Sequence, residues 1–196
     1  MEMRENAALV IVDVQKGFEE EVWGRRNNPG AEGNIAALID VWQSSGRPVV
    51  FVRHDSTQVE GSASPLRPGY AGNGFKDFVE QRRGKGSGPE LLVTKSVNSA
   101  FYGEPDLDAW LKGAGVGQIV VAGIQTNMCN ETTARMGGNL GYEVFFPLDA
   151  MHTFDLEGPF GWTRTADELS RATAVSLHGG GFAKVVTTEE LVAAAG

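Results

Sequence analysis

The stretch VVAGIQTNMCNETTARMGGNLGYEV, residues 120–144, decides the fold of this 196-residue chain. It begins as an apolar run short enough to be a buried strand, and residues 128–139 then show helical spacing that ends near Gly141. A second apolar run begins at Glu143. A strand, a helix and another strand in succession are typical of a parallel sheet, because the helix carries the chain back to the starting edge.

The same alternation recurs along the whole chain. Six apolar runs are predicted strands: residues 7–12, 48–52, 91–94, 118–122, 143–146 and 183–186. Four segments between them are predicted helices: residues 33–44, 107–112, 128–139 and 165–177. Because right-handed crossovers place helices on both faces of a parallel sheet, the prediction is one α/β domain over residues 1–196. It is a three-layer αβα, Rossmann-like fold with a six-stranded, mainly parallel sheet, and its active site is expected at the carboxyl ends of the strands.

Residues 53–74 and 84–89 show little periodicity, and both stretches lie between predicted strands of the one sheet. They are therefore predicted to be surface loops and not domain linkers.

The composition limits the partners. Seventeen Lys and Arg against 25 Asp and Glu give a formal net charge of −8, which repels phosphate backbones and anionic lipid surfaces. No apolar run approaches the roughly 20 residues of a membrane helix, and the start MEMRENAALV lacks the basic region of a signal peptide. We expect a cytoplasmic protein that binds a small molecule and neither nucleic acid nor membranes.

The one cysteine of the chain, Cys129, cannot form an internal disulfide or a structural zinc cluster. A lone cysteine is most often core packing, but Cys129 lies among Asn127, Asn130 and Glu131 where a strand turns into a helix. Free N–H groups at a helix start stabilise an anion, so this position is expected to lower the pKa of the thiol and to hold an oxyanion.

Asp13 and Lys95 end the first and third apolar runs. Taken singly, Asp13 is as well explained as a helix cap or a hydrogen-bonded buried acid, and Lys95 as a solvated lysine beyond a strand. Together with Cys129, however, they converge at one edge of a parallel sheet, which is what nucleophilic catalysis requires.

Three segments carry a resemblance to a known family: LVIVDVQKGF (9–18), VTKSVNSAF (93–101) and VVAGIQTNMCNETTARMGGNLGYEVFFPLDA (120–150). The chain resembles the isochorismatase-like cysteine hydrolases, whose catalytic triad is Asp, Lys and Cys in this order. The resemblance implies that Cys129 attacks a carbonyl carbon, that Asp13 accepts the thiol proton and later activates water, and that Lys95 keeps Asp13 ionised. It also implies a cis peptide before Gln125, with the N–H groups of Gln125 and Cys129 forming the oxyanion hole.

The resemblance further implies that no metal and no cofactor is needed. Nicotinamidases in the family have an Asp and several His as a metal site after the second strand, whereas FVRHDSTQVEGSASPLRPG (51–69) offers only His54 and Asp55. His54 is predicted either to line the substrate pocket or to cap a loop.

Retention of cysteine with the full triad favours hydrolysis of a C–N bond in a small amide, as in the amidase-type, streptothricin hydrolase-like members. One alternative is an isochorismatase-type vinyl-ether hydrolase, which would tolerate Cys129→Ala. A second is a non-enzymatic binding or assembly module, in which the thiol would not react in the folded state.

Several side chains in segments that follow strand ends are candidates for the substrate pocket, although each could instead pack in the core or at an interface. They are Phe18, Trp23, His54, Phe101, Tyr102, Asn127 and His152. The resemblance also implies a homo-oligomer, a dimer or a tetramer.

Overall fold

A parallel sheet forms the centre of the computed structural model, which describes residues 2–57 and 64–196. The sheet order is β3-β2-β1-β4-β5-β9, and every strand pair in it is parallel. These six strands are β1 (Ala8–Val12), β2 (Val49–His54), β3 (Glu90–Lys95), β4 (Gln118–Ile124), β5 (Glu143–Pro147) and β9 (Lys184–Val186). They correspond to the six predicted apolar runs, so the predicted α/β class is confirmed.

The predicted number of six strands is wrong, because the sheet has a seventh, β6 (Met151–His152). β5 pairs with β4 only as far as Val120, and β6 then pairs with Gly123 and Ile124 at the carboxyl end of the same strand. A two-residue strand has too short a pattern to be recognised from alternation.

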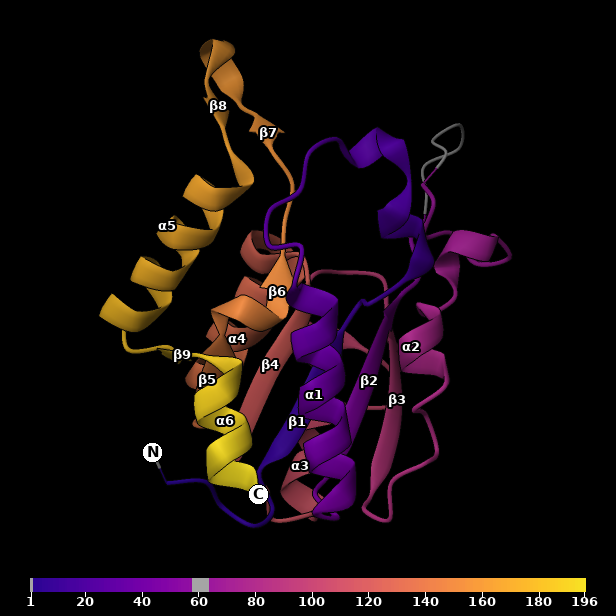
Figure 1. Cartoon of the computed structure of the whole chain (residues 1–196), viewed down its shortest axis with the longest axis vertical. Coiled ribbons are helices and arrows are strands. Elements are labelled where there is room, and N and C mark those ends of the chain that lie inside the picture. The colour runs from indigo at the N-terminus through magenta and orange to yellow at the C-terminus, as the bar shows by residue number, and fades with distance from the viewer. Residues whose placement is uncertain (1, 58–63) are drawn as a thin grey trace.

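Helices cover both faces of the sheet (Figure 1). One face carries α1 (Ala31–Ser44), α2 (Asp77–Glu80) and α6 (Thr188–Ala195), whose side chains pack with Leu9 and Phe51. The opposite face carries α3 (Leu107–Gly113), α4 (Glu131–Asn139) and α5 (Ala166–Gly179), which pack with Val10. The three predicted layers are therefore present, although the sequence reading missed α2 and α6.

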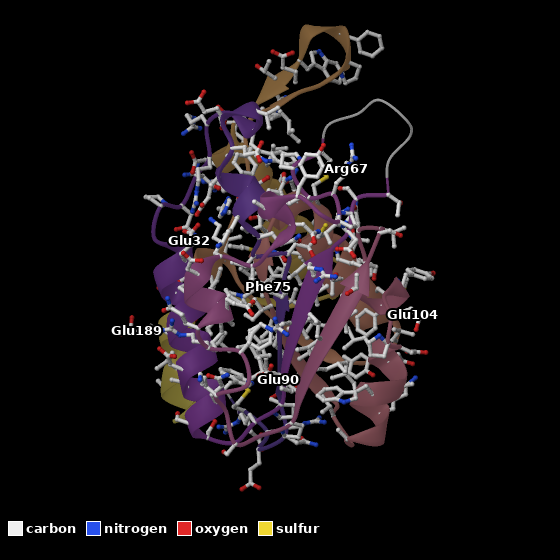
Figure 2. The ribbon with its side chains drawn as sticks, turned by 90° about the vertical axis from the view of Figure 1, so that its right-hand side faces the viewer. Glu32, Arg67, Phe75, Glu90, Glu104 and Glu189 are labelled. Atoms are coloured by element: carbon white, nitrogen blue, oxygen red, sulfur yellow. The ribbon has the colours of Figure 1, made fainter. Side chains whose placement is uncertain are left out.

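Large apolar side chains fill the space between these layers (Figure 2). Phe75 lies in the interior against Phe51, with ring centroids 6.3 Å apart, whereas Glu104 and Glu189 lie at the periphery. Since β1 and β4 are buried along their whole length, their alternate residues serve the two separate cores. This explains why both strands are continuous apolar runs.

Gly123 allows β4 to lie against β1 just before the chain leaves the sheet. Its φ is +133°, and a Cβ atom there would lie 2.0 Å from the carbonyl oxygen of Val12. No other residue type fits this approach, which brings the turn after β4 next to Asp13.

The connections add short elements that the sequence did not reveal. A hairpin, β7 (Leu156–Glu157) and β8 (Thr163–Arg164), stands away from the body of the molecule in Figure 1. The single-turn helices are η1 (Lys16–Glu19), η2 (Glu21–Trp23), η3 (Ala71–Asn73), η4 (Ala100–Tyr102), η5 (Thr126–Asn130), η6 (Leu148–Ala150) and η7 (Pro159–Gly161). Among the described residues no helix is long and apolar enough to cross a membrane.

The predicted surface loop 53–74 is only partly at the surface. Leu66 and Asn73 are buried, and the Asn73 side-chain amide donates to the backbone oxygen of His54 at 3.1 Å. Residues 58–63 of this predicted loop lie outside the described part of the chain.

Candidate active site

The structure brings together Asp13, Lys95 and Cys129. The Lys95 ammonium lies 2.6 Å from Asp13 Oδ2 and 3.4 Å from Cys129 Sγ. Asp13 directly follows β1, Lys95 ends β3 and Cys129 lies in η5 after β4, so all three come from carboxyl ends of parallel strands. The side chains of Asp13 and Lys95 are fully buried, and this burial strengthens the electrostatic interaction between them.

Asp13 has an unusual backbone conformation. Its φ is +53°, a left-handed value that aspartate tolerates better than most residues, and its N–H donates to the Val52 oxygen at 2.9 Å. Oδ2 is occupied by Lys95, while Oδ1 is buried and has no hydrogen-bond partner in the described part of the chain. Oδ1 is thus the atom of this carboxylate that is available to accept a proton.

The surroundings of Cys129 favour the thiol over the thiolate. Burial and the negative charge of Asp13 raise its pKa well above the ordinary value, and Lys95 opposes this only in part. The sequence-based expectation of a lowered pKa is therefore wrong, because desolvation and a carboxylate act more strongly on Cys129 than the start of the helix does.

His54 is a fourth member of this cluster. Its Nδ1 lies 3.1 Å from the Lys95 ammonium. Burial and the positive charge of Lys95 lower the pKa of His54, so the ring is neutral near pH 7. Asp13, His54 and Cys129 each present a potential metal-ligand atom, and the three atoms lie within 4.8 Å of one another. The Lys95 ammonium contacts all three side chains and supplies a positive charge among them.

A cavity of about 220 Å³ opens onto this cluster. Of the predicted pocket residues it contains Phe18, Trp23 and His54, and it also contains Gln125 and Cys129. Sequence reasoning missed the other side chains of the wall, which are Ser56, Ser64, Leu66, Asn98 and Met128. Asn98 could have been predicted, because it lies in the VTKSVNSAF segment that carries the family resemblance. Its Oδ1 is 3.9 Å from Cys129 Sγ.

Four predicted pocket residues do not line this cavity. Phe101 stacks on Tyr142 against the core, with ring centroids 5.8 Å apart, and Tyr102 is exposed to solvent. Asn127 accepts a hydrogen bond from the Thr153 hydroxyl. His152 is fully buried, and its ring packs edge-on against Phe154. These residues follow strand ends, but their side chains turn toward the interior or the solvent.

The peptide between Ile124 and Gln125 is cis, as the family resemblance implied. Gln125 is buried at the cavity wall, and its side-chain oxygen accepts a hydrogen bond from Thr153 at 3.2 Å. Its backbone oxygen accepts from Met128 N and Asn130 N, each at 3.2 Å. These two bonds hold the turn that carries Cys129.

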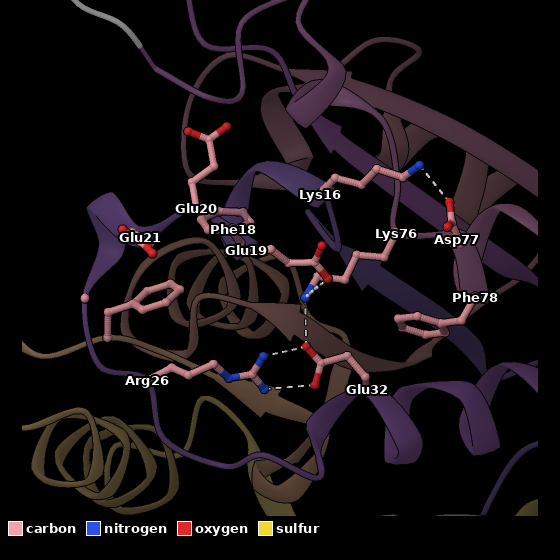
Figure 3. A pocket seen from close by; sticks show the side chains of 12 residues that line it. Lys16, Phe18, Glu19, Glu20, Glu21, Arg26, Glu32, Lys76, Asp77 and Phe78 are labelled. Carbon is pink, nitrogen blue, oxygen red and sulfur yellow. Dashed lines mark hydrogen bonds and ion pairs between the residues drawn. The ribbon is translucent and has the colours of Figure 1, made fainter.

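A larger cavity, of about 740 Å³, also borders Phe18, and none of the described residues that line it belongs to the cluster around Cys129 (Figure 3). Its floor is an ion-pair network in which Glu32 binds Arg26 at 2.6 Å and Lys76 at 2.8 Å. Burial opposes ionisation of Glu32, but the hydrogen bonds from these two cations prevail and lower its pKa to about 2. The thiol of Cys129 and its neighbours Asp13 and His54 line the smaller cavity.

Known proteins resemble this chain along most of its length. The isochorismatase domain family matches residues 7–190. The isochorismatase family protein YrdC of Bacillus subtilis is 34% identical over 97% of this chain and 96% of its own. Nicotinamidase 3 of Arabidopsis thaliana is 31% identical over 94% of this chain and 86% of its own. The crystal structure of an isochorismatase-family protein from Chromobacterium violaceum superimposes with a TM-score of 0.89 at 34% identity, over 100% of this chain and 96% of that one.

Proposed function

Because this chain belongs to the isochorismatase family, we propose that it is a cysteine hydrolase that cleaves the C–N bond of a small amide through a thioester. Cys129 is the nucleophile, Asp13 the proton acceptor and donor, and Lys95 the cation that holds both. The compound that it hydrolyses is small, because the cavity at Cys129 is of about 220 Å³.

The observation that carries this proposal is the position of the Lys95 ammonium, in contact with both Asp13 Oδ2 and Cys129 Sγ. A structural lysine at the end of a strand would extend its ammonium into water, since an unpaired buried charge is costly. Here the ammonium bridges a carboxylate and the one thiol of the chain, an arrangement that serves to generate a nucleophile.

The reaction then follows in two balanced halves. As Sγ bonds to the carbonyl carbon, the thiol proton passes to Asp13 Oδ1, and the C–N bond breaks when that proton is delivered to the leaving nitrogen. Water attacks the resulting thioester, Asp13 accepts a proton from it, and the acid leaves as Sγ is protonated again. Lys95 keeps Asp13 ionised at the start of each half.

The negative oxygen of each tetrahedral intermediate needs hydrogen-bond donors. The backbone N–H groups of Gln125 and Cys129 are proposed for this role, since both residues border the cavity and preorganised N–H groups stabilise such an oxygen effectively.

An amide is favoured over a vinyl ether because an ether cleavage does not need a thiol. The relative Nicotinamidase 3 bears the name of an enzyme acting on an amide. The aromatic rings of Phe18 and Trp23, with centroids 5.0 Å apart, give the cavity an apolar wall that suits a flat or apolar acyl group.

The test is to incubate the wild type, Cys129→Ser and Cys129→Ala with a panel of small amides, measuring released amine and protein mass. We expect wild-type turnover with a transient acyl adduct on residue 129, and loss of at least about 100-fold in both variants. Urea unfolding of the three proteins shows whether a lost activity is due to a loss of stability. Turnover that survives in Cys129→Ala would support the ether hydrolase instead.

We also propose that the chain self-associates. The tip of the β7–β8 hairpin carries Phe160 and Trp162, which are 88% and 63% exposed. Adjacent exposed aromatic side chains favour burial in an interface. Light scattering after size exclusion should give a dimer or a larger assembly for the wild type, and a smaller species for Phe160→Ser/Trp162→Ser. A monomeric wild type contradicts this proposal.

A further inference from the structure

The Lys95 ammonium has three hydrogen-bond donors, and the structure gives it three neighbours. They are Asp13 Oδ2 at 2.6 Å, His54 Nδ1 at 3.1 Å and Cys129 Sγ at 3.4 Å. An ammonium has no lone pair and cannot accept a hydrogen bond. In the contact with His54, therefore, the lysine is the donor and Nδ1 is the acceptor.

This contact fixes the tautomer of the imidazole. A neutral ring carries one hydrogen, and if Nδ1 accepts, the hydrogen is on Nε2. Nε2 forms no hydrogen bond with the described part of the chain, and the ring lines the cavity at Cys129. The cavity therefore gains an N–H donor with a defined position.

We propose that His54 has two linked roles: its Nδ1 holds the Lys95 ammonium in place, and its Nε2–H donates a hydrogen bond to an acceptor atom of the bound amide. The inference rests on the proposed function of Cys129. It adds a residue to the three that the family resemblance supplied and assigns a direction to each of its hydrogen bonds.

The proposal also narrows the class of substrate. One ring nitrogen of His54 lies within 4.8 Å of Cys129 Sγ, so Nε2, which belongs to the same five-membered ring, is near the sulfur to which the reacting carbonyl carbon must bond. The acceptor atom that His54 would bind is therefore close to the reacting carbonyl. Amides with an oxygen or a ring nitrogen beside the carbonyl should be preferred over hydrocarbon analogues, because a donor left without a partner in a closed site is costly.

The tautomer can be measured without a substrate. In the protein labelled with ¹⁵N-histidine, long-range proton–nitrogen spectra distinguish protonated from unprotonated ring nitrogens, and His54→Gln assigns the signals. We expect an unprotonated Nδ1 and a protonated Nε2 near pH 7. The opposite tautomer, or a ring protonated on both nitrogens near pH 7, overturns the proposal.

Two variants separate the two roles. The Asn amide of His54→Asn can reach the place of Nδ1 but not that of Nε2, whereas His54→Phe supplies neither. Iodoacetamide labelling of Cys129 should be slowed about five-fold in His54→Phe, the effect of losing one hydrogen bond to the ammonium, and should be near the wild-type rate in His54→Asn. Equal rates in all three proteins would refute the role of Nδ1.

Protection from labelling tests the donor role. Picolinamide has a ring nitrogen beside its carbonyl and benzamide has none, so picolinamide should protect wild-type Cys129 at a lower concentration. This difference should vanish in both variants. Equal protection by the two amides, or protection by neither, overturns the donor role. If wild-type Cys129 is labelled only after unfolding, the proposed function itself fails, whereas the tautomer spectra remain a separate test of the His54 contact.

Discussion

The side-chain amide of Gln15 binds both backbone polar groups of His54. Its Oε1 accepts from His54 N at 2.8 Å, and its Nε2 donates to His54 O at 3.0 Å. The same Nε2 also donates to the Asn73 oxygen at 2.8 Å. Gln15 is fully buried and lies two residues after Asp13, so the segment that carries the Asp13 carboxylate also holds the end of β2.

Replacement of Gln15 by Met tests this connection, because Met is similar in length and forms none of the three hydrogen bonds. We expect a loss of about 2–4 kcal/mol in the free energy of unfolding, since His54 N and Asn73 O lose their partner and His54 O keeps only the bond from the Asn73 side chain. Turnover by the folded fraction should also fall, because His54 is no longer held. Urea titration and amide turnover measure the two effects, and Gln43→Met, which removes one partly buried bond to Arg82 O, is the matched control. Unchanged turnover in folded Gln15→Met would show that the hydrogen bonds from Gln15 to the backbone of His54 are not needed for turnover.

Substitution of Asp13 by Asn should change alkylation and turnover in opposite directions. The carboxylate raises the pKa of the Cys129 thiol, so removing its charge lowers that pKa and should speed iodoacetamide labelling at a given pH. Turnover should nevertheless fall by about 10²–10⁴, because no base remains. The exposed Asp77, paired with Lys16 at 2.6 Å, supplies the control Asp77→Asn, in which both rates should equal those of the wild type. Slower labelling in Asp13→Asn would contradict this electrostatic description.

Much of the fold could be predicted because the sheet is parallel and buried. Strands covered on both faces are continuous apolar runs, and the six runs in the sequence became the six strands of the main path. The positions of Asp13, Lys95 and Cys129 at strand ends were equally informative, since parallel strands bring their carboxyl ends to one edge. Topology alone was enough to bring these three residues together.

The remaining features depend on the directions of side chains, which a linear pattern does not contain. Phe101 and His152 follow strand ends as Phe18 and His54 do, yet both turn into the core. The pKa of Cys129 depends on burial and on its distance from Asp13, so the start of the helix was a poor guide to its direction. Gln15 had no visible signal, because its partners are backbone atoms 39 and 58 residues away.

His152 should make the protein sensitive to mild acid. Burial, and secondarily the charge of Arg26, lower its pKa from 6.5 to about 3, and neither ring nitrogen has a hydrogen-bond partner in the described part of the chain. Between these two pKa values the unfolded state binds more protons than the folded state, so stability falls as the pH falls below 6.5. The contribution of His152 to this slope is at most about 1.4 kcal/mol per pH unit.

Replacement of His152 by Leu should remove that contribution. Urea unfolding at pH 6.5 and pH 5 gives the slope in a window above 4.5, the ordinary pKa of Glu32, where that carboxylate contributes little and equally in both proteins. The difference in slope between wild type and variant isolates His152, because His54 titrates in both. The exposed His178→Gln should keep the wild-type slope. If the free energy of unfolding changed with pH equally in His152→Leu and in the wild type, the buried ring would be protonated as easily as a free one.

In the ion-pair network on the floor of the larger cavity, the loss of Glu32 and the loss of Lys76 should lower the free energy of unfolding by different amounts (Figure 3). Glu32→Gln leaves Lys76, whose side chain is 5% exposed, with Glu19 at 3.3 Å as its one carboxylate partner among the described residues. Lys76→Met leaves Glu32 bound through both oxygens to Arg26.

We therefore expect Glu32→Gln to lower the free energy of unfolding at pH 7 by about 3 kcal/mol and Lys76→Met by about 1 kcal/mol, since a buried ammonium whose remaining carboxylate is largely exposed costs more than a carboxylate that keeps both bonds to Arg26. The double variant should cost less than the sum of the two, because it removes the stranded ammonium together with its acid. Lys16→Met breaks an exposed pair and should cost less than about 0.5 kcal/mol. Urea titration of the four variants measures these free energies of unfolding. A larger loss for Lys76→Met than for Glu32→Gln would show that Arg26 alone does not stabilise the Glu32 carboxylate.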